Sequence, residues 1–75
     1  MNTMHRNETS ANLSATEADI MRWLAAGKSN LEIATLRGRS PATVRNQLHR
    51  VYRKLGARTR GQAVQLWLAN QSPAA

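Results

Sequence analysis

Arginine, asparagine and histidine side chains recur along one segment of the chain at the spacing of a helix face. Arg45, Asn46 and His49 fall about 100° to 200° around a helix axis from Val44, which begins an apolar stripe. A guanidinium matches the two acceptors of guanine, an asparagine amide pairs with an adenine edge or a phosphate, and a histidine donates to a guanine acceptor or a phosphate. These three side chains are therefore candidate base-reading groups for DNA.

Further cations lie beside this face. Arg53 lies on the outer side of the same helix, and Arg50 and Lys54 lie where they would reach phosphates while the centre of the face enters a groove. The alternative is an ordinary solvated surface, because many amphipathic helices carry charge on their exposed side. The absence of any acidic residue from residues 37–60 argues against that alternative.

The charge of the chain is concentrated in its second part. Eight of the eleven lysine and arginine residues fall within residues 37–60. Residues 1–32 have a net charge of −1, whereas residues 33–75 have a net charge of +8, which together give the overall +7. This asymmetry predicts a directed binding face for a polyanion rather than a uniformly basic surface.

A second group of polar residues precedes a short expected helix. Ser29 and Asn30 lie at its N-terminus, where free amides and the helix dipole favour an anion, and Lys28 adjoins them. One interpretation is a phosphate clamp that fixes the register of the base-reading helix. The other is ordinary capping, and Ser29 can do both. Glu32 is interpreted as a capping-box partner rather than a site residue.

Length and composition restrict the remaining possibilities. The 75 residues allow one small domain, and there is no cysteine for a disulfide or thiolate metal site. We expect a polar, disordered tail over residues 1–12, a domain over residues 13–70 and a frayed tail over residues 71–75. No apolar run has the length of a membrane span and no secretory signal is recognised, so we expect a soluble, intracellular protein.

Few residues in this sequence have the types and spacing that catalysis requires. The two histidines are far apart, and the four acids form no pair of the kind that acid–base chemistry needs. No metal-ligand spacing and no phosphate-binding glycine loop occurs. We therefore expect no catalytic residue, metal, cofactor or small-molecule ligand.

Local signals predict four helices and no strand. Capping boxes begin the first two helices, Ser40 followed by proline begins the third, and Thr59 can cap the fourth. Glycines mark the first three ends. The short link before the third helix indicates a helix-turn-helix within an all-α four-helix bundle. The expected segments run from Ser14 to Gly27, from Ser29 to Gly38, from Pro41 to Leu55 and over residues 60–70. The apolar stripe of the first segment is Ile20, Met21 and Leu24, and that of the second is Ile33, Ala34 and Leu36. The apolar stripe of the third segment is Val44, Leu48, Val51 and Leu55.

The last helix carries an apolar arc of roughly 200°, about twice what packing on one side requires. One interpretation is a helix wedged deeply into a small core. The other is a homodimer contact, which would also allow a two-fold-symmetric DNA site to be read. The residues assigned to this contact are Val64, Leu66, Trp67 and Leu68, with Ala63 completing the arc. Trp23 and Trp67 are expected to be core residues rather than base-stacking platforms, and Tyr52 is expected to be half exposed.

Short motifs follow one another in order from residue 13 to residue 68. They are Leu13-Ser-Ala-Thr-Glu17, Gly27-Lys-Ser-Asn30, Glu32-Ile-Ala34, Ser40, Thr43-Val44-Arg45, Lys54-Leu-Gly56 and Ala63-Val64. In this order and spacing they resemble the LuxR-type (GerE-like) helix-turn-helix domain of bacterial transcription regulators. Four positions depart from the usual pattern: Thr16 and His49 replace commonly basic residues, and Arg37 and Arg39 stand where many members are apolar.

The resemblance implies a DNA-binding domain whose third helix enters the major groove and whose fourth helix often forms a dimer contact. By position, Arg45, Asn46 and His49 fall on base-facing sites, and Ser29, Asn30, Thr43 and Arg50 fall near the DNA backbone. It also implies a regulator in the bacterial cytoplasm, at the nucleoid, with RNA polymerase as a further candidate partner. Two alternatives stay open: region 4 of a sigma factor, and a protein-interaction module that uses the apolar face of the last helix.

Overall fold

Four α-helices make up the part of the chain that the structure, a computed structural model, describes, which is residues 12–71. No strand occurs within that range. The prediction of an all-α fold with four helices is confirmed. Of the tails expected over residues 1–12 and 71–75, residues 1–11 and 72–75 lie outside the described residues, whereas residue 12 is described and residue 71 belongs to the last helix. The helices are α2 (Ala15–Ala25), α3 (Asn30–Arg37), α4 (Pro41–Leu55) and α5 (Arg60–Gln71).

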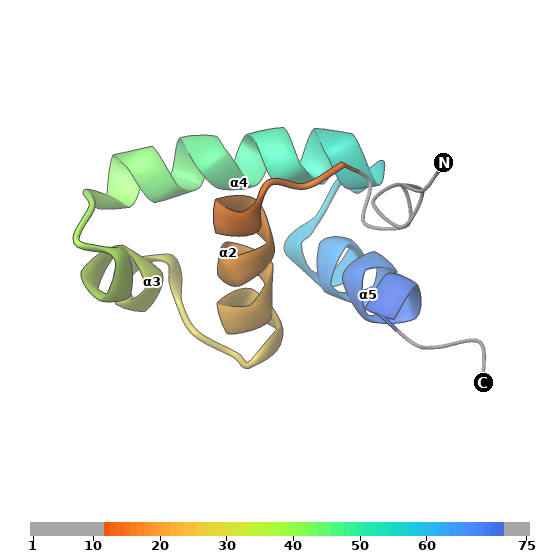
Figure 1. Cartoon of the computed structure of the whole chain (residues 1–75), viewed down its shortest axis with the longest axis horizontal. Helices are drawn as coiled ribbons and strands as arrows, with labels where there is room; N and C mark the ends of the chain where they lie inside the picture. The colour runs from red at the N-terminus through yellow and green to blue at the C-terminus, as the bar shows by residue number, and fades with distance from the viewer. Residues whose placement is uncertain (1–11, 72–75) are drawn as a thin grey trace.

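The longest helix, α4, lies across the other three. Figure 1 shows α4 along one side of the molecule, with α3, α2 and α5 side by side beneath it. Each of the three packs against α4, and α2 also packs against both of its neighbours. None of the other three described helices covers the side of α4 that faces away from this layer.

The helices begin where the sequence predicts them to begin. The Ser14 hydroxyl accepts from the amide of Glu17 at 3.1 Å, and the Glu17 carboxylate accepts from the amide of Ser14 at 2.9 Å. Ser29 and Glu32 form the same reciprocal pair at 3.0 and 2.8 Å. Because a capping box satisfies two otherwise free amides, each pair stops the helix from starting earlier or later.

A connection of three residues joins α3 to α4 and completes the helix-turn-helix. Gly38 ends α3 with φ +66°, a left-handed conformation that residues with a Cβ rarely adopt. Ser40 then caps α4, its hydroxyl accepting from the amide of Thr43 at 3.1 Å, and Pro41 occupies the first helical position. These local constraints fix where α4 begins relative to α3.

The core lies between α4 and the three helices beneath it. The inner face of α4 is confirmed, since Val44, Leu48 and Val51 are at most 2% exposed, and Leu55 is partly buried against the core. One expectation is wrong: Leu36 is 54% exposed. The expected stripe of α3 is therefore reduced to Ile33 and Ala34. The buried apolar residues are Ile20, Met21, Leu24, Ile33, Ala34, Val44, Leu48, Val51, Ala63 and Trp67.

Candidate nucleic-acid interface

The outer face of α4 presents cationic and amide side chains to solvent. Arg45, Asn46 and His49 are all exposed, as are Arg50 and Arg53. The opposite face of the same helix is fully buried, so the helix cannot rotate without exposing the core. Burial of the apolar side therefore fixes the direction in which the polar side points.

The arginines of this face are available for an external anion. Among residues 12–71, the guanidinium groups of Arg45, Arg50 and Arg53 make no hydrogen bond and no ion pair. The rings of His49 and Tyr52 lie 6.4 Å apart in a tilted arrangement. Tyr52 is half-buried, as expected. Burial raises the pKa of its hydroxyl, and the positive charge of Arg60 partly opposes that rise.

Lys54 forms an ion pair within the domain, unlike the other cations of α4. Its Nζ lies 2.8 Å from Oε1 of Glu17, whose side chain is only 7% exposed. The same ammonium lies 3.5 Å from the carbonyl oxygen of Asn12. In the described residues the Lys54 ammonium therefore forms an ion pair that joins the start of α2 to the end of α4. The phosphate contact expected for Lys54 stays a prediction.

The electrostatics of Glu17 follow from this pair. Burial alone raises the pKa of the carboxyl group. Hydrogen bonds from Lys54 and Ser14, together with the charge of Lys54, outweigh burial and hold the pKa below its ordinary value. Glu17 is thus ionised at neutral pH, and it serves both as a helix cap and as the partner of Lys54.

The polar group at the start of α3 lies close to the start of α5. Ser29 and Lys28 are exposed, and Asn30 is half-buried. Arg60 donates to the side-chain oxygen of Asn30 at 3.3 Å and to the backbone carbonyl of Lys28. Glu32 acts as a cap, as expected: its bond from the Ser29 amide holds the pKa of its carboxyl group below the ordinary value.

Two contacts in the interface were not indicated by the sequence. The Arg60 contact above spans 30 residues, and no local spacing rule predicts it. Arg37 donates to the side-chain oxygen of Gln47 at 3.4 Å, which joins α3 to the flank of α4. Arg39 and Thr43 are exposed, and the Thr43 hydroxyl lies 3.0 Å from that of Ser40. In the sequence, only the arginines in the turn before α4, at positions where many family members are apolar, indicated a role for this region.

The apolar arc of α5 divides into a buried part and an exposed part. Trp67 is 4% exposed, which confirms it as a core residue and removes it from the residues assigned to a dimer contact. Trp23 is partly buried against the core. Val64 and Leu66 are half-buried, and Leu68 is 53% exposed. The exposed part of the arc is therefore much narrower than the sequence arc of about 200°.

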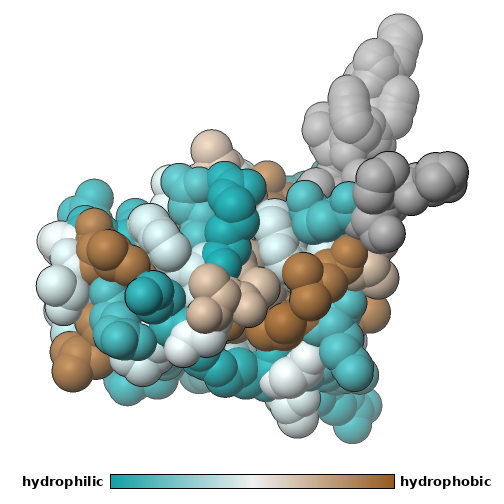
Figure 2. Space-filling model, turned by 90° about the horizontal axis from the view of Figure 1, so that it is seen from below, coloured by the Kyte–Doolittle hydropathy of each residue, from teal (hydrophilic) through white to brown (hydrophobic). Residues whose placement is uncertain are grey.

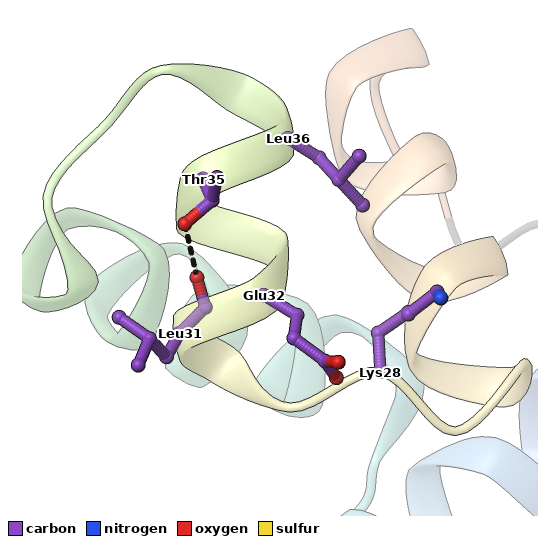
Figure 3. A pocket seen from close by; sticks show the side chains of 5 residues that line it. All are labelled: Lys28, Leu31, Glu32, Thr35 and Leu36. Atoms are coloured by element: carbon purple, nitrogen blue, oxygen red, sulfur yellow. Dashed lines mark hydrogen bonds between the residues drawn. The ribbon is translucent and has the colours of Figure 1, made fainter.

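The face opposite α4 is mixed in character. Figure 2 shows hydrophobic atoms in separate areas among hydrophilic ones, towards the ends of the view where α3 and α5 lie in Figure 1. A shallow depression of about 390 Å³ lies over α3, lined by Lys28, Leu31, Glu32, Thr35 and Leu36. Figure 3 shows Leu31 and Leu36 pointing in different directions, so the two leucines do not form one continuous apolar surface.

Two further classes of site do not occur within the described residues. No group of three or more side chains that could hold a metal ion occurs in residues 12–71. None of the four helices is long and apolar enough to cross a membrane. The outer face of α4 is therefore the best-supported candidate binding site in this part of the chain.

Comparison with known proteins identifies a family for most of the chain. The sequence pattern described as "Bacterial regulatory proteins, luxR family" matches residues 11–67. This range includes α2, α3, α4 and most of α5. No solved structure matches the chain significantly.

Three curated relatives align with the same part of the chain. A probable HTH-type transcriptional regulator, GfsR, from Streptomyces halstedii is 47% identical over 58 residues, which is 77% of this chain and 24% of the relative. The HTH-type transcriptional activator RamA from Corynebacterium glutamicum is 42% identical over 64 residues, which is 85% of this chain and 23% of the relative. The transcriptional activator protein PhzR from Pseudomonas fluorescens is 39% identical over 56 residues, which is 75% of this chain and 23% of the relative. The chain thus spans about a quarter of the length of these relatives.

Proposed function

The chain belongs to the luxR family of bacterial regulatory proteins, and from that membership we propose that it binds a specific sequence of double-stranded DNA and regulates transcription. The observation that carries the proposal is the outer face of α4. It is exposed, cationic and free of acidic residues, while its inner face is locked into the core. A helix of 15 residues is about 22 Å long, and the major groove of B-DNA admits a helix.

The proposed roles of the side chains follow from their donors. Arg45 lies in the second turn of α4, where a recognition helix meets base edges, and its guanidinium can donate to both acceptors of guanine. Asn46 and His49 supply further donors to bases or to adjacent phosphates. The proposed backbone contacts are Lys28, Ser29, Asn30, Thr43, Arg50 and Arg53, all of them at least partly exposed.

Selection of bound duplexes from a random pool tests this proposal. We expect the chain to recover one sequence class, with the conserved base pairs spaced as a single helix in a major groove would contact them. An inverted repeat among the recovered sequences would support a dimer as well. Recovery of no duplex at low salt would reject DNA binding and favour the protein-interaction alternative.

The affinity for DNA is expected to fall steeply with salt. Each phosphate neutralised by a lysine or arginine contributes a slope of about −0.9 to the logarithm of affinity against the logarithm of salt concentration. Titrations of a labelled duplex at several salt concentrations measure this slope. Arg50→Ala is expected to reduce its magnitude by about one phosphate equivalent. An association that does not change with salt would contradict the proposed interface.

We propose further that the chain forms a homodimer through α5. Gly61, Val64 and Leu68 share one side of this helix at spacings of three and four residues, and a Cβ added at Gly61 would meet no atom within 4 Å. This open surface would let a second helix approach closely. Leu66 lies on the other flank of Trp67, about 160° from Leu68, so it is not included in the proposed contact.

The dimer proposal predicts the effect of a charge at Leu68. Leu68→Glu is expected to shift the chain from dimer to monomer in sedimentation experiments at high concentration, because two buried carboxylates would face each other across the two-fold axis. Leu31→Glu is the matched control, since Leu31 on α3 is also an exposed leucine, at 64% against 53% for Leu68. If the Leu68 variant has the same mass as the unchanged protein, this interface is wrong.

For the whole protein, we propose regulation of transcription in the bacterial cytoplasm, with RNA polymerase as a further partner. The matched region is only about a quarter of each of these relatives, which supports a role for this domain as the DNA-binding part of a larger assembly. The sigma-factor alternative fits less well, because the matched family consists of regulatory proteins.

A further inference from the structure

Arg60 joins parts of the molecule that are distant in sequence. It is the first residue of α5, and its guanidinium donates to the backbone carbonyl of Lys28 and to the side-chain oxygen of Asn30. Its charge also acts on Tyr52 of α4. One guanidinium thus connects the start of α5 with Lys28 and with the start of α3.

The contact determines which way the amide of Asn30 faces. A guanidinium has only donors, so the atom of Asn30 that faces Arg60 must be the oxygen Oδ1. The amide nitrogen Nδ2 is then on the other side, and its two N–H groups donate to no other residue within residues 12–71. A phosphodiester oxygen is an acceptor only, which matches these free donors.

We propose that Arg60 is a positioning residue for the DNA-backbone contact at Lys28 and Asn30. By holding Oδ1 of Asn30 and the carbonyl of Lys28, it turns the Asn30 N–H groups towards a phosphate and fixes them relative to α4. The proposal rests on the proposed DNA-binding function, to which it adds a residue that acts through another one. It requires the fork of an arginine, because one ammonium group does not match two separated acceptors in this fixed geometry.

The test compares substitutions that keep the charge. Arg60→Lys is expected to lower affinity for a labelled random-sequence duplex at low salt by roughly tenfold, the effect of losing one charge-assisted hydrogen bond. Arg58→Lys is the matched control two residues away, because no hydrogen bond of the Arg58 side chain occurs within the described residues. It is expected to leave affinity unchanged. In an Asn30→Ala background, Arg60→Lys is expected to change affinity by less than about twofold.

A second substitution separates positioning from simple support of the fold. Asn30→Asp keeps an acceptor for Arg60 but removes both donors, so thermal unfolding is expected at the same or a higher temperature while duplex affinity falls at least tenfold. Affinity unchanged in Arg60→Lys, or lowered equally with and without Asn30, would overturn the proposal. If the lysine variant does not fold, unchanged affinity in Asn30→Asp overturns it alone. If the unchanged chain binds no duplex at all, the proposed function itself fails.

Discussion

Replacing Arg45 by alanine is expected to lower affinity for the preferred duplex by about 1–3 kcal/mol, or roughly 5- to 150-fold, and to relax the preference at one base pair. Arg45 lies in the second turn of the exposed face of α4 and forms no ion pair within residues 12–71. Its substitution therefore removes an external contact without leaving an unpaired partner inside the domain. Binding titrations on the selected duplex and on single-base variants of it measure both effects.

The matched control for Arg45 is another exposed arginine on the same helix. Arg50→Ala removes the same charge from the flank of α4, where a phosphate contact is proposed. We expect Arg50→Ala to lower affinity for the preferred duplex and for a random duplex by the same factor. Arg45→Ala is expected to lower affinity for the preferred duplex more than for the random one. If both variants lose the same affinity on both duplexes, Arg45 contacts the backbone and another residue of α4 reads the bases.

The parts of the fold that follow from local rules could be predicted from the sequence. The capping pair of Ser29 and Glu32, the proline start of α4 and the inner face of α4 each depend on residues within one or two turns of one another. The direction of the face proposed to read bases followed in turn, because burial of Val44 and Leu48 leaves only one orientation for that helix. Residue types at short spacing determine these features.

Features that depend on the packing of distant segments could not be predicted. The pairing of Glu17 with Lys54 spans 37 residues, and the contact of Arg60 with Asn30 spans 30. Both involve long, flexible side chains for which several partners were sterically possible. The sequence gives their charge but not the neighbour that packing brings within reach. As a result, the sequence predicts a phosphate contact for Lys54 without indicating its ion pair, and it indicates no role for Arg60.

The width of the buried face of each short helix could not be predicted either. Periodicity divides a helix into faces but does not tell how wide the buried face is. In α3, Leu31 and Leu36 stay exposed because only Ile33 and Ala34 reach the core. In α5, the core takes Ala63 and Trp67 and leaves Leu68 outside. The width of the buried face is set by the neighbouring helices, which a single-helix pattern does not contain.

Glu17→Ala is expected to destabilise the domain by roughly 2–3 kcal/mol, which for a domain of this size lowers the unfolding temperature by roughly 10 °C or more. The substitution removes the carboxylate half of the capping box of α2 and leaves the Lys54 ammonium without its partner. The full cost of breaking a buried pair is not expected, because the Lys54 side chain is 34% exposed and water can reach it. Glu17→Gln, which retains a capping acceptor, is expected to cost about half as much.

The pH dependence of stability separates the charge of Glu17 from its packing. Since the pKa of Glu17 is lower in the folded chain than its ordinary value of 4.5, the ionised carboxylate stabilises the fold fully above that value. This contribution is lost as the pH falls through the lower pKa of the folded state. Glu17→Gln does not titrate, so its deficit relative to the unchanged protein should shrink as the pH falls below about 4.5. Urea unfolding at several pH values measures this difference, and a deficit that stays constant would mean that Glu17 acts by packing and capping alone, not through Lys54.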